Sequence, residues 1–271
     1  MGSVTSFSKF VPLFGGLILA AGCGTLAERI DDYAARQGME RRVIRGEPFR
    51  HVVYERLGTG PVETLHVYIE GDGRPWLRGR TVAADPTPRI AYALELMARD
   101  PRPSVYLGRP CYFGLHGDGP CEERFWTSAR YAPEVVDSMA AALERLSADL
   151  GYPEVVLVGY SGGGTLAVLL ADRVARPRGV VTVAANLDTD RWTARHGYLP
   201  LEGSLNPMTS ARLREVPHVH FGGAGDTVVS GDTIEAFAER HGGRYRIVDG
   251  FDHRCCWRQR WPALLYEAGL R

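Results

Sequence analysis

Short apolar runs alternate with amphipathic segments along most of the chain. The apolar runs are rich in β-branched residues and predict strands at residues 64–69, 104–107, 155–158, 180–184, 218–221 and 245–248. Apolar residues at helical spacing predict helices between them at residues 89–99, 133–150, 162–176, 207–215 and 233–241, and a last one at residues 259–268. This alternation predicts an α/β fold with a mostly parallel sheet of about eight strands and helices on both faces. Functional sites in such sheets lie beyond the carboxyl ends of the strands.

The N-terminal segment has a different pattern. One basic residue, Lys9, precedes an apolar stretch at residues 10–21, and small residues follow. This is the pattern of a signal peptide, and it is shorter than an ordinary membrane span of about 20 residues. We therefore expect a signal peptide at residues 1–22.

The end of this segment, "LAAGC" from Leu19 to Cys23, resembles the lipobox of bacterial lipoproteins. In that family, cleavage leaves a lipid-modified cysteine as the new first residue, which here would be Cys23. Leu19 lies one place further from the cysteine than in the commonest pattern. The resemblance implies a protein held at a membrane of the bacterial cell envelope by a lipid anchor. The alternative is a plain secretory signal with an incidental Cys23.

The mature chain begins with a segment of its own. Residues 26–38 have helical spacing and a closing glycine, and residues 48–57 alternate like a strand. We expect an N-terminal tether and helix at residues 23–47 and a single domain at residues 48–271.

Length, composition and charge agree with one globular domain. The chain has 271 residues, and 45% of them are hydrophobic, which is enough for a substantial core. The 32 basic residues balance the 32 acidic ones and form no basic block. Because neutralisation of phosphates supplies most nucleic-acid affinity, we expect no nucleic-acid partner.

One serine lies between glycines where a predicted strand meets a predicted helix. The sequence "GYSGG", from Gly159 to Gly163, is a GxSxG motif in the strand–turn–helix context of a nucleophile elbow. Side chains at Gly159 and Gly163 would collide with the helix and strand, while Ser161 takes a strained conformation at the tip. The turn has neither the GK[ST] ending nor the GxGxxG spacing of a phosphate-binding loop. The motif therefore predicts a nucleophile at Ser161.

A serine hydroxyl needs a base to take its proton and an acid to orient that base. Both residue types follow later in the chain: Asp226 comes in a glycine loop directly after a predicted strand, and His253 comes after the last strand. The order Ser, Asp, His is the one expected for this type of elbow. Asp188, after the strand at 180–184, and Asp252, beside the histidine, are alternative acids.

With these residues in this order, the sequence from about Pro48 onward resembles the α/β-hydrolase superfamily. The resemblance implies that Ser161 attacks a carbonyl, that His253 moves the proton, and that Asp226 holds the imidazole. It also implies an oxyanion hole with two backbone donors. The first would be Gly162, and the second would be Asp72 in the glycine turn "EGDG", with Gly73 as the alternative.

The sequence also indicates which residues surround the substrate site. Tyr160, inside the elbow, is the best candidate for a residue that lines the substrate site. The connection at residues 191–207, where family members insert a lid, is short. A large lid domain is therefore not expected.

The four cysteines other than Cys23 can form disulfides in an oxidising compartment. Cys111 and Cys121 flank a loop rich in glycine, and we expect them to be bonded to each other. Cys255 and Cys256 are adjacent, and joining neighbours makes a strained ring, so free thiols or cross-pairing are alternatives. No CxxC or HxxxH spacing supports a metal site, and we expect neither metal nor cofactor.

Together these observations predict an exported, lipid-anchored serine hydrolase that cleaves a small-molecule ester through an acyl-enzyme. A peptidase or a thioesterase could use the same triad, because a fold does not fix a substrate. A catalytically inactive hydrolase fold that serves as a surface binding lipoprotein is the alternative from another class.

Overall fold

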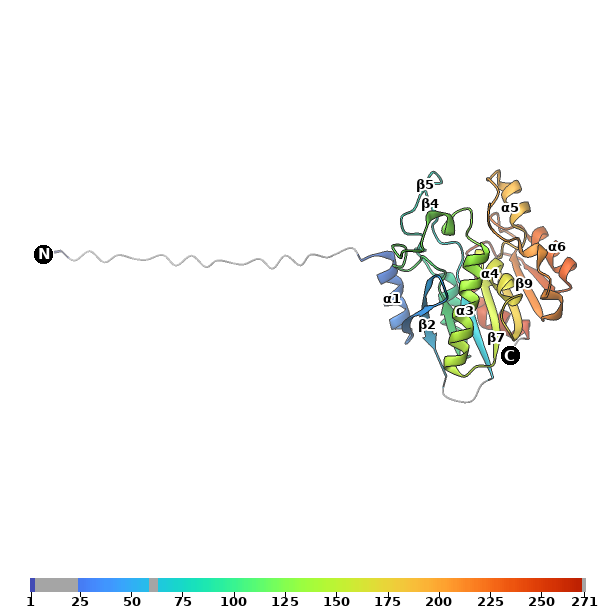
Figure 1. Ribbon diagram of the computed structural model, residues 1–271, viewed down its shortest axis with the longest axis horizontal. Coiled ribbons are helices and arrows are strands. Elements are labelled where there is room, and N and C mark those ends of the chain that lie inside the picture. The colour runs from blue at the N-terminus through green and yellow to red at the C-terminus, as the bar shows by residue number, and fades with distance from the viewer. Residues whose placement is uncertain (3–23, 59–62, 270–271) are drawn as a thin grey trace.

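The computed structural model describes residues 1–2, 24–58 and 63–269 (Figure 1). Its strands are β1 (Glu40–Arg45), β2 (Arg50–Arg56), β3 (Thr64–Ile69), β4 (Trp76–Leu77), β5 (Thr81–Val82), β6 (Ser104–Leu107), β7 (Glu154–Tyr160), β8 (Pro177–Val183), β9 (His218–Gly223) and β10 (Arg244–Val248). Its α-helices are α1 (Leu26–Arg36), α2 (Tyr92–Met97), α3 (Pro133–Leu150), α4 (Gly162–Ala171), α5 (Thr189–His196), α6 (Gly231–His241) and α7 (Trp257–Ala268). Short 3-10 turns form at η1 (Glu123–Trp126), η2 (Pro207–Thr209) and η3 (Leu213–Glu215).

The main sheet has eight strands in the order β1-β2-β6-β3-β7-β8-β9-β10. The pairs β1–β2 and β2–β6 are antiparallel, and all pairs from β6 to β10 are parallel. The central strands β3 and β6 are buried along their whole length, because helices cover both faces of the sheet. The predicted mostly parallel α/β sheet is therefore confirmed.

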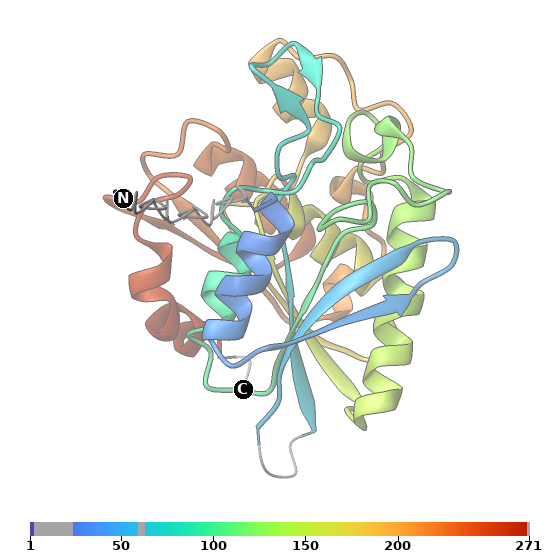
Figure 2. The ribbon, with the colours of Figure 1, turned by 90° about the vertical axis from the view of Figure 1, so that its left-hand side faces the viewer.

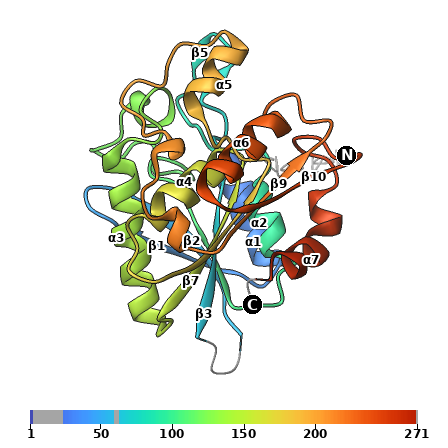
Figure 3. The ribbon, with the colours of Figure 1, turned by 90° about the vertical axis from the view of Figure 1, so that its right-hand side faces the viewer.

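The helices form a layer on each side of the sheet. In Figures 2 and 3, α3 lies on one side of the sheet and α1, α2 and α7 lie on the other. Helices α3 and α4 contact each other, as do α2 and α7. The carboxyl ends of the parallel strands point to the end of the molecule where the β4–β5 hairpin and α5 project (Figure 1). Any site of the kind expected for this fold belongs at that end.

The N-terminal boundary of the folded domain differs from the one predicted at Pro48. Strand β1 pairs with β2 over its whole length, from Glu40 to Arg45, and so belongs to the main sheet. Helix α1 also contributes Ile30 and Ala34 to the hydrophobic core. The sequence of β1, "ERRVIR", hides this strand because an edge strand that is mostly exposed needs no regular apolar alternation.

Three further elements differ from the sequence prediction. The segment predicted as a helix at 207–215 forms η2 and η3 instead, where Asp172 accepts hydrogen bonds from the amides of Ala211 and Arg212 and interrupts the helix. Residues within the predicted connection at 191–207 form most of α5, which Asp188 caps by accepting from the Arg191 amide. The β4–β5 hairpin was not predicted, since strands of two residues are too short to show a period.

Cysteines 111 and 121 form a disulfide, as the sequence predicted. Within the described residues, no helix is long and apolar enough to cross a bilayer. The predicted signal segment and Cys23 fall among residues 3–23, outside the described residues.

Candidate active site

Ser161 lies at the tip of the turn between β7 and α4. Its backbone has φ 52° and ψ −124°, a region that residues with a side chain rarely adopt. The turn is so tight that a Cβ on Gly159 would lie 2.2 Å from the carbonyl oxygen of Gly163. A Cβ on Gly163 would lie 2.1 Å from the carbonyl oxygen of Ile69 in the neighbouring strand. The glycines therefore allow the turn that presents the serine.

The structure brings Ser161, His253 and Asp226 together in one line. His253 Nε2 lies 3.0 Å from Ser161 Oγ, and His253 Nδ1 lies 2.8 Å from Asp226 Oδ2. The three side chains come from the ends of β7 and β9 and from the loop after β10, so the parallel strands deliver them to the same edge. The arrangement has the geometry of a nucleophile, a base and an acid that orients the base.

The carboxylate of Asp226 is surrounded by three hydrogen-bond donors. While one carboxylate oxygen faces His253, the other accepts from the amides of Val228 and Val229 at 2.8 and 2.9 Å. Three donors fix the carboxylate in the buried loop and compensate its lost hydration. The alternative acids are used elsewhere: Asp188 caps α5, and Asp252 accepts from the amides of Arg254 and Cys255.

The loop that carries His253 is held at several points. Tyr160 donates its hydroxyl to the backbone carbonyl of His253 at 2.7 Å, so this side chain links the elbow to the base. Trp257 donates its indole N–H to the carbonyl of Asp252 at 2.9 Å. Tyr160 was predicted to line the substrate site; it is buried, and its hydroxyl is directed to the histidine loop.

Cys255 and Cys256 are joined to each other by a disulfide. Free thiols and cross-pairing were the alternatives left open by the sequence, and the structure shows neither. Cys256 has a positive φ of 80° and precedes the first residue of α7. The ring therefore lies in the short connection between the base and the last helix.

The sequence predicted two backbone donors for an oxyanion, Gly162 and Asp72, with Gly73 as the alternative to Asp72. Gly162 is the first residue of α4, where an N–H has no acceptor within its own helix. In the turn after β3, the Gly71 amide donates to Glu70 and the Arg74 amide donates to the carbonyl of Pro86. In the part of the chain that the structure describes, neither the Asp72 amide nor the Gly73 amide donates to a protein acceptor. The hydrogen bonds therefore leave Gly162 free and do not distinguish Asp72 from Gly73 as the second donor.

The side chain of Asp72 packs against the residue after the nucleophile. A Cβ on Gly162 would lie 2.1 Å from Asp72 Oδ1. Arg109 and Arg130 each donate to this carboxylate, at 2.5 and 2.9 Å, and the Tyr131 hydroxyl donates to it at 2.7 Å. We call these four side chains, Asp72, Arg109, Arg130 and Tyr131, the Asp72 clamp.

The Asp72 clamp carries a surplus positive charge. Burial acts to raise the pKa of Asp72, but the two guanidinium groups outweigh it and lower this pKa to about 2. The carboxylate is therefore ionised and balances only one of the two arginines, both of which are buried. The remaining positive charge lies close to Gly162, because the carboxylate that both arginines bind packs against that residue.

Glu70 is buried next to this turn. Its two carboxyl oxygens accept from the amides of Gly71 and Ala93, each at 3.0 Å. Burial raises the pKa of Glu70 to about 8, against the opposing effect of these two hydrogen bonds. Because Ala93 is in the first turn of α2, Glu70 ties the start of that helix to the turn after β3.

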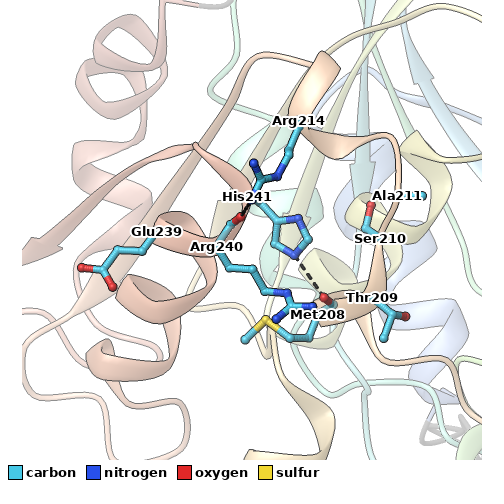
Figure 4. Close-up of a pocket in the computed structure, with 8 residues that line it drawn as sticks. All are labelled: Met208, Thr209, Ser210, Ala211, Arg214, Glu239, Arg240 and His241. Atoms are coloured by element: carbon cyan, nitrogen blue, oxygen red, sulfur yellow. Dashed lines mark hydrogen bonds between the residues drawn. The ribbon is translucent and has the colours of Figure 1, made fainter.

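One cavity among the described residues lies away from the triad. It has a volume of about 450 Å³, and Figure 4 shows the residues that line it: Met208, Thr209, Ser210, Ala211, Arg214, Glu239, Arg240 and His241. In this cavity His241 contacts the carbonyl of Met208, and Arg214 donates to the carbonyl of Arg240. A second cavity of about 390 Å³ includes Tyr152 and Arg176. Both cavities lie at the amino ends of the strands, opposite the end where this fold places its chemistry.

No group of three or more His, Cys, Asp or Glu side chains in the described residues is arranged to hold a metal ion. Arg109, Arg130 and Tyr131 were not identified from the sequence as site residues. They are separated from Asp72 by 37 to 59 positions and carry no local motif, so only the fold shows their role.

No protein-family model matches the sequence, and neither does any curated protein. The fold is similar to solved structures. The Pyrococcus furiosus esterase Pf2001 aligns over 86% of this chain and 91% of its own, with a TM-score of 0.63 and 13% identity. A puromycin hydrolase aligns with a TM-score of 0.61 and 18% identity over 86% of this chain, which spans 38% of the hydrolase.

A bacterial membrane phospholipase A aligns over 90% of this chain and 91% of its own, with a TM-score of 0.54 and 14% identity. At these identities the comparisons establish the fold and leave the substrate open. The chain has the α/β-hydrolase fold, and residues 24–58 and 63–269 include no large lid domain.

Proposed function

We propose that the protein is an exported, lipid-anchored serine hydrolase that cleaves a carboxylic ester through an acyl-enzyme intermediate. The line of hydrogen bonds from Ser161 through His253 to Asp226 carries this proposal. The fold supports it, because esterases, peptidases and a phospholipase are among the similar structures.

In the first half of the reaction, Ser161 Oγ attacks the carbonyl carbon while His253 Nε2 takes the hydroxyl proton. The negative charge that develops on the carbonyl oxygen is received by the amides of Gly162 and Asp72. Asp226 stabilises the imidazolium that forms. The tetrahedral intermediate then collapses, and His253 gives its proton to the leaving alcohol.

In the second half, water attacks the acyl-enzyme, and His253 accepts a proton from that water. The second tetrahedral intermediate then collapses: its bond to Ser161 Oγ breaks, His253 gives the proton to that oxygen, and the acid is released. The surplus positive charge of the Asp72 clamp supports both halves, since the same oxygen becomes negative in each.

A fluorophosphonate probe tests whether the protein is an enzyme. We expect the full chain to be labelled at Ser161, and we expect Ser161→Ala and His253→Ala to lose labelling and turnover while they remain folded. A folded wild-type protein that is never labelled would instead support the inactive binding lipoprotein.

The class of carbonyl is tested separately. We expect p-nitrophenyl esters to be hydrolysed with higher kcat/KM than peptide amides or acyl thioesters. A preference for amides would identify a peptidase, and a preference for thioesters would identify a thioesterase.

Lipid anchoring is tested in cells that process lipoproteins. We expect radiolabelled palmitate to enter the wild-type protein and globomycin to block its processing. A Cys23→Ser protein that is still lipidated would contradict the proposed anchor.

A further inference from the structure

Large apolar side chains are exposed mainly at the active-site end of the molecule. Among the described residues, six of them lie in loops and in the short hairpin at this end: Trp76, Leu77, Ile90, Tyr198, Leu199 and Val228. Exposed apolar side chains that gather on one face mark contact surfaces, whereas single scattered ones do not. Trp76 is 44% exposed, Leu77 is 38% exposed and Leu199 is 86% exposed.

The β4–β5 hairpin presents the first two of these side chains. It projects beyond the carboxyl ends of the sheet strands (Figure 1), and a Cβ on its tip residue Gly79 would meet nothing within 4 Å. The turn is closed by a hydrogen bond from the Arg80 amide to the Leu77 carbonyl at 3.1 Å. Trp76 and Leu77 are therefore held in solvent by a formed hairpin.

The segment after α5 presents the other exposed side chains. The ring of Tyr198 stacks on that of His196 with 5.3 Å between the ring centroids, and its centroid lies 5.2 Å from that of Trp192. These two rings support Tyr198, although more than half of its surface is exposed. Leu199 follows it without such support. Figures 1 and 2 both show α5 and the β4–β5 hairpin at the same end of the molecule.

Three exposed arginines lie in and beside the hairpin, and the carboxylate of the same segment, Asp85, lies 3.8 Å from His116. Arg78, Arg80 and Arg89 are exposed, and in the described part of the chain none of them forms an ion pair with a carboxylate. By contrast, Arg191 and Arg195 of α5 both pair with Asp232. The unpaired arginines beside Trp76 and Leu77 are complementary to an anionic surface.

We propose that Trp76, Leu77, Tyr198 and Leu199, the apolar rim, insert into the surface of a bilayer that contains anionic phospholipid. Tryptophan and tyrosine favour the boundary between headgroups and acyl chains, where Trp76 and Tyr198 would lie. Arg78, Arg80 and Arg89 would face the phosphate groups, since each basic residue near such a surface adds attraction. In this orientation the end of the sheet that carries Ser161 faces the membrane. The inference goes beyond the proposed hydrolysis and does not require it.

The position of Trp76 can be read directly from its fluorescence. The full chain carrying Ser161→Ala is mixed with vesicles of brominated phosphatidylcholine and an equal amount of phosphatidylglycerol, and the same chain with Trp76→Phe gives the Trp76 contribution by difference. We expect the brominated lipid to quench the Trp76 emission. A lipid tether elsewhere in the chain would leave Trp76 unquenched, so this readout separates insertion from anchoring, and it does not depend on activity.

Matched variants test the two contributions. Arg78→Gln with Arg80→Gln should raise the lipid concentration needed for half-maximal quenching by roughly 25-fold, about fivefold for each arginine. Arg260→Gln, an exposed arginine on α7, should leave it unchanged. Leu77→Ser with Leu199→Ser should raise the lipid concentration needed for half-maximal quenching roughly tenfold. Leu57, at the far end of β2, is 41% exposed, and Leu57→Ser should leave this concentration unchanged.

Unquenched Trp76 emission in the mixed vesicles would overturn the proposal. Equal quenching with phosphatidylcholine alone would overturn the role of the anionic lipid. Loss of self-association in the rim variants by sedimentation velocity, without quenching, would identify a second copy of the chain as the occupant and so would also overturn it.

Discussion

Ser161 gives the sharpest prediction about stability, because its backbone conformation favours a residue without a side chain. At φ 52° and ψ −124°, a residue with a Cβ is strained by about 1–2 kcal/mol. Glycine removes this strain but loses about 0.5–1 kcal/mol of backbone entropy relative to alanine. Ser161→Gly and Ser161→Ala both remove the hydroxyl that faces His253. Their difference therefore isolates the strain, and we expect the glycine variant to be more stable by about 0.5–1 kcal/mol.

The assay is thermal and urea unfolding of the full chain. A difference of this size corresponds to a Tm higher by about 1–4 °C in a protein of this length. Both variants should be inactive, so activity and stability are read from the same pair. The matched control is Ser147, in the last turn of α3, where the order should reverse and alanine should be more stable than glycine by up to about 1 kcal/mol. Equal stability of the two Ser161 variants would refute the assigned strain.

Three other predictions address the pH dependence, the disulfide and the base. Burial lowers the pKa of His51 to about 4, so the stability it contributes is complete above pH 6.5 and is lost as the pH falls toward 4. Urea titrations across this range should show a loss of up to about 3 kcal/mol from this group, and His51→Gln should flatten the decline. Replacing Cys111 and Cys121 together by alanine opens a link between residues 10 positions apart and should lower the unfolding free energy by about 3 kcal/mol, measured under oxidising conditions. An unchanged urea midpoint would count against it. Tyr160→Phe should lower kcat on a soluble ester roughly tenfold and leave KM nearly unchanged, because the hydrogen bond that it removes positions His253 and does not bind substrate. A change in KM alone would instead assign the Tyr160 side chain to the substrate site.

The parallel part of the fold could be predicted from the sequence because its strands are buried on both faces. In β7, for example, "EVVLVGY" is a continuous apolar run, and helix α4 follows directly after Ser161. Edge and loop elements lack this signal. Strand β1 is mostly exposed and polar, and α5 is a short helix with a polar sequence. Neither element has an apolar pattern long enough to be recognised as a strand or a helix.

The candidate site was predictable only where one residue type needs another. A serine nucleophile requires a base and an acid, so the elbow directed attention to Asp226 and His253. The oxyanion side has no such requirement for particular side chains, because backbone amides supply the donors. Arg109 and Arg130 therefore carried no sequence signal, and their convergence on Asp72 follows from the way that loops after β3 and β6 meet.

The ring formed by Cys255 and Cys256 makes the chemical state of the protein depend on how it is produced. It lies two residues after His253, in the connection to α7. Synthesis in a reducing cytoplasm keeps such thiols reduced, whereas export to an oxidising compartment allows the bond to form. Preparations from the two sources are therefore different molecules at the loop that carries the base. The number of free thiols in each preparation should therefore be measured by mass spectrometry before the hydrolysis rates of the two preparations are compared.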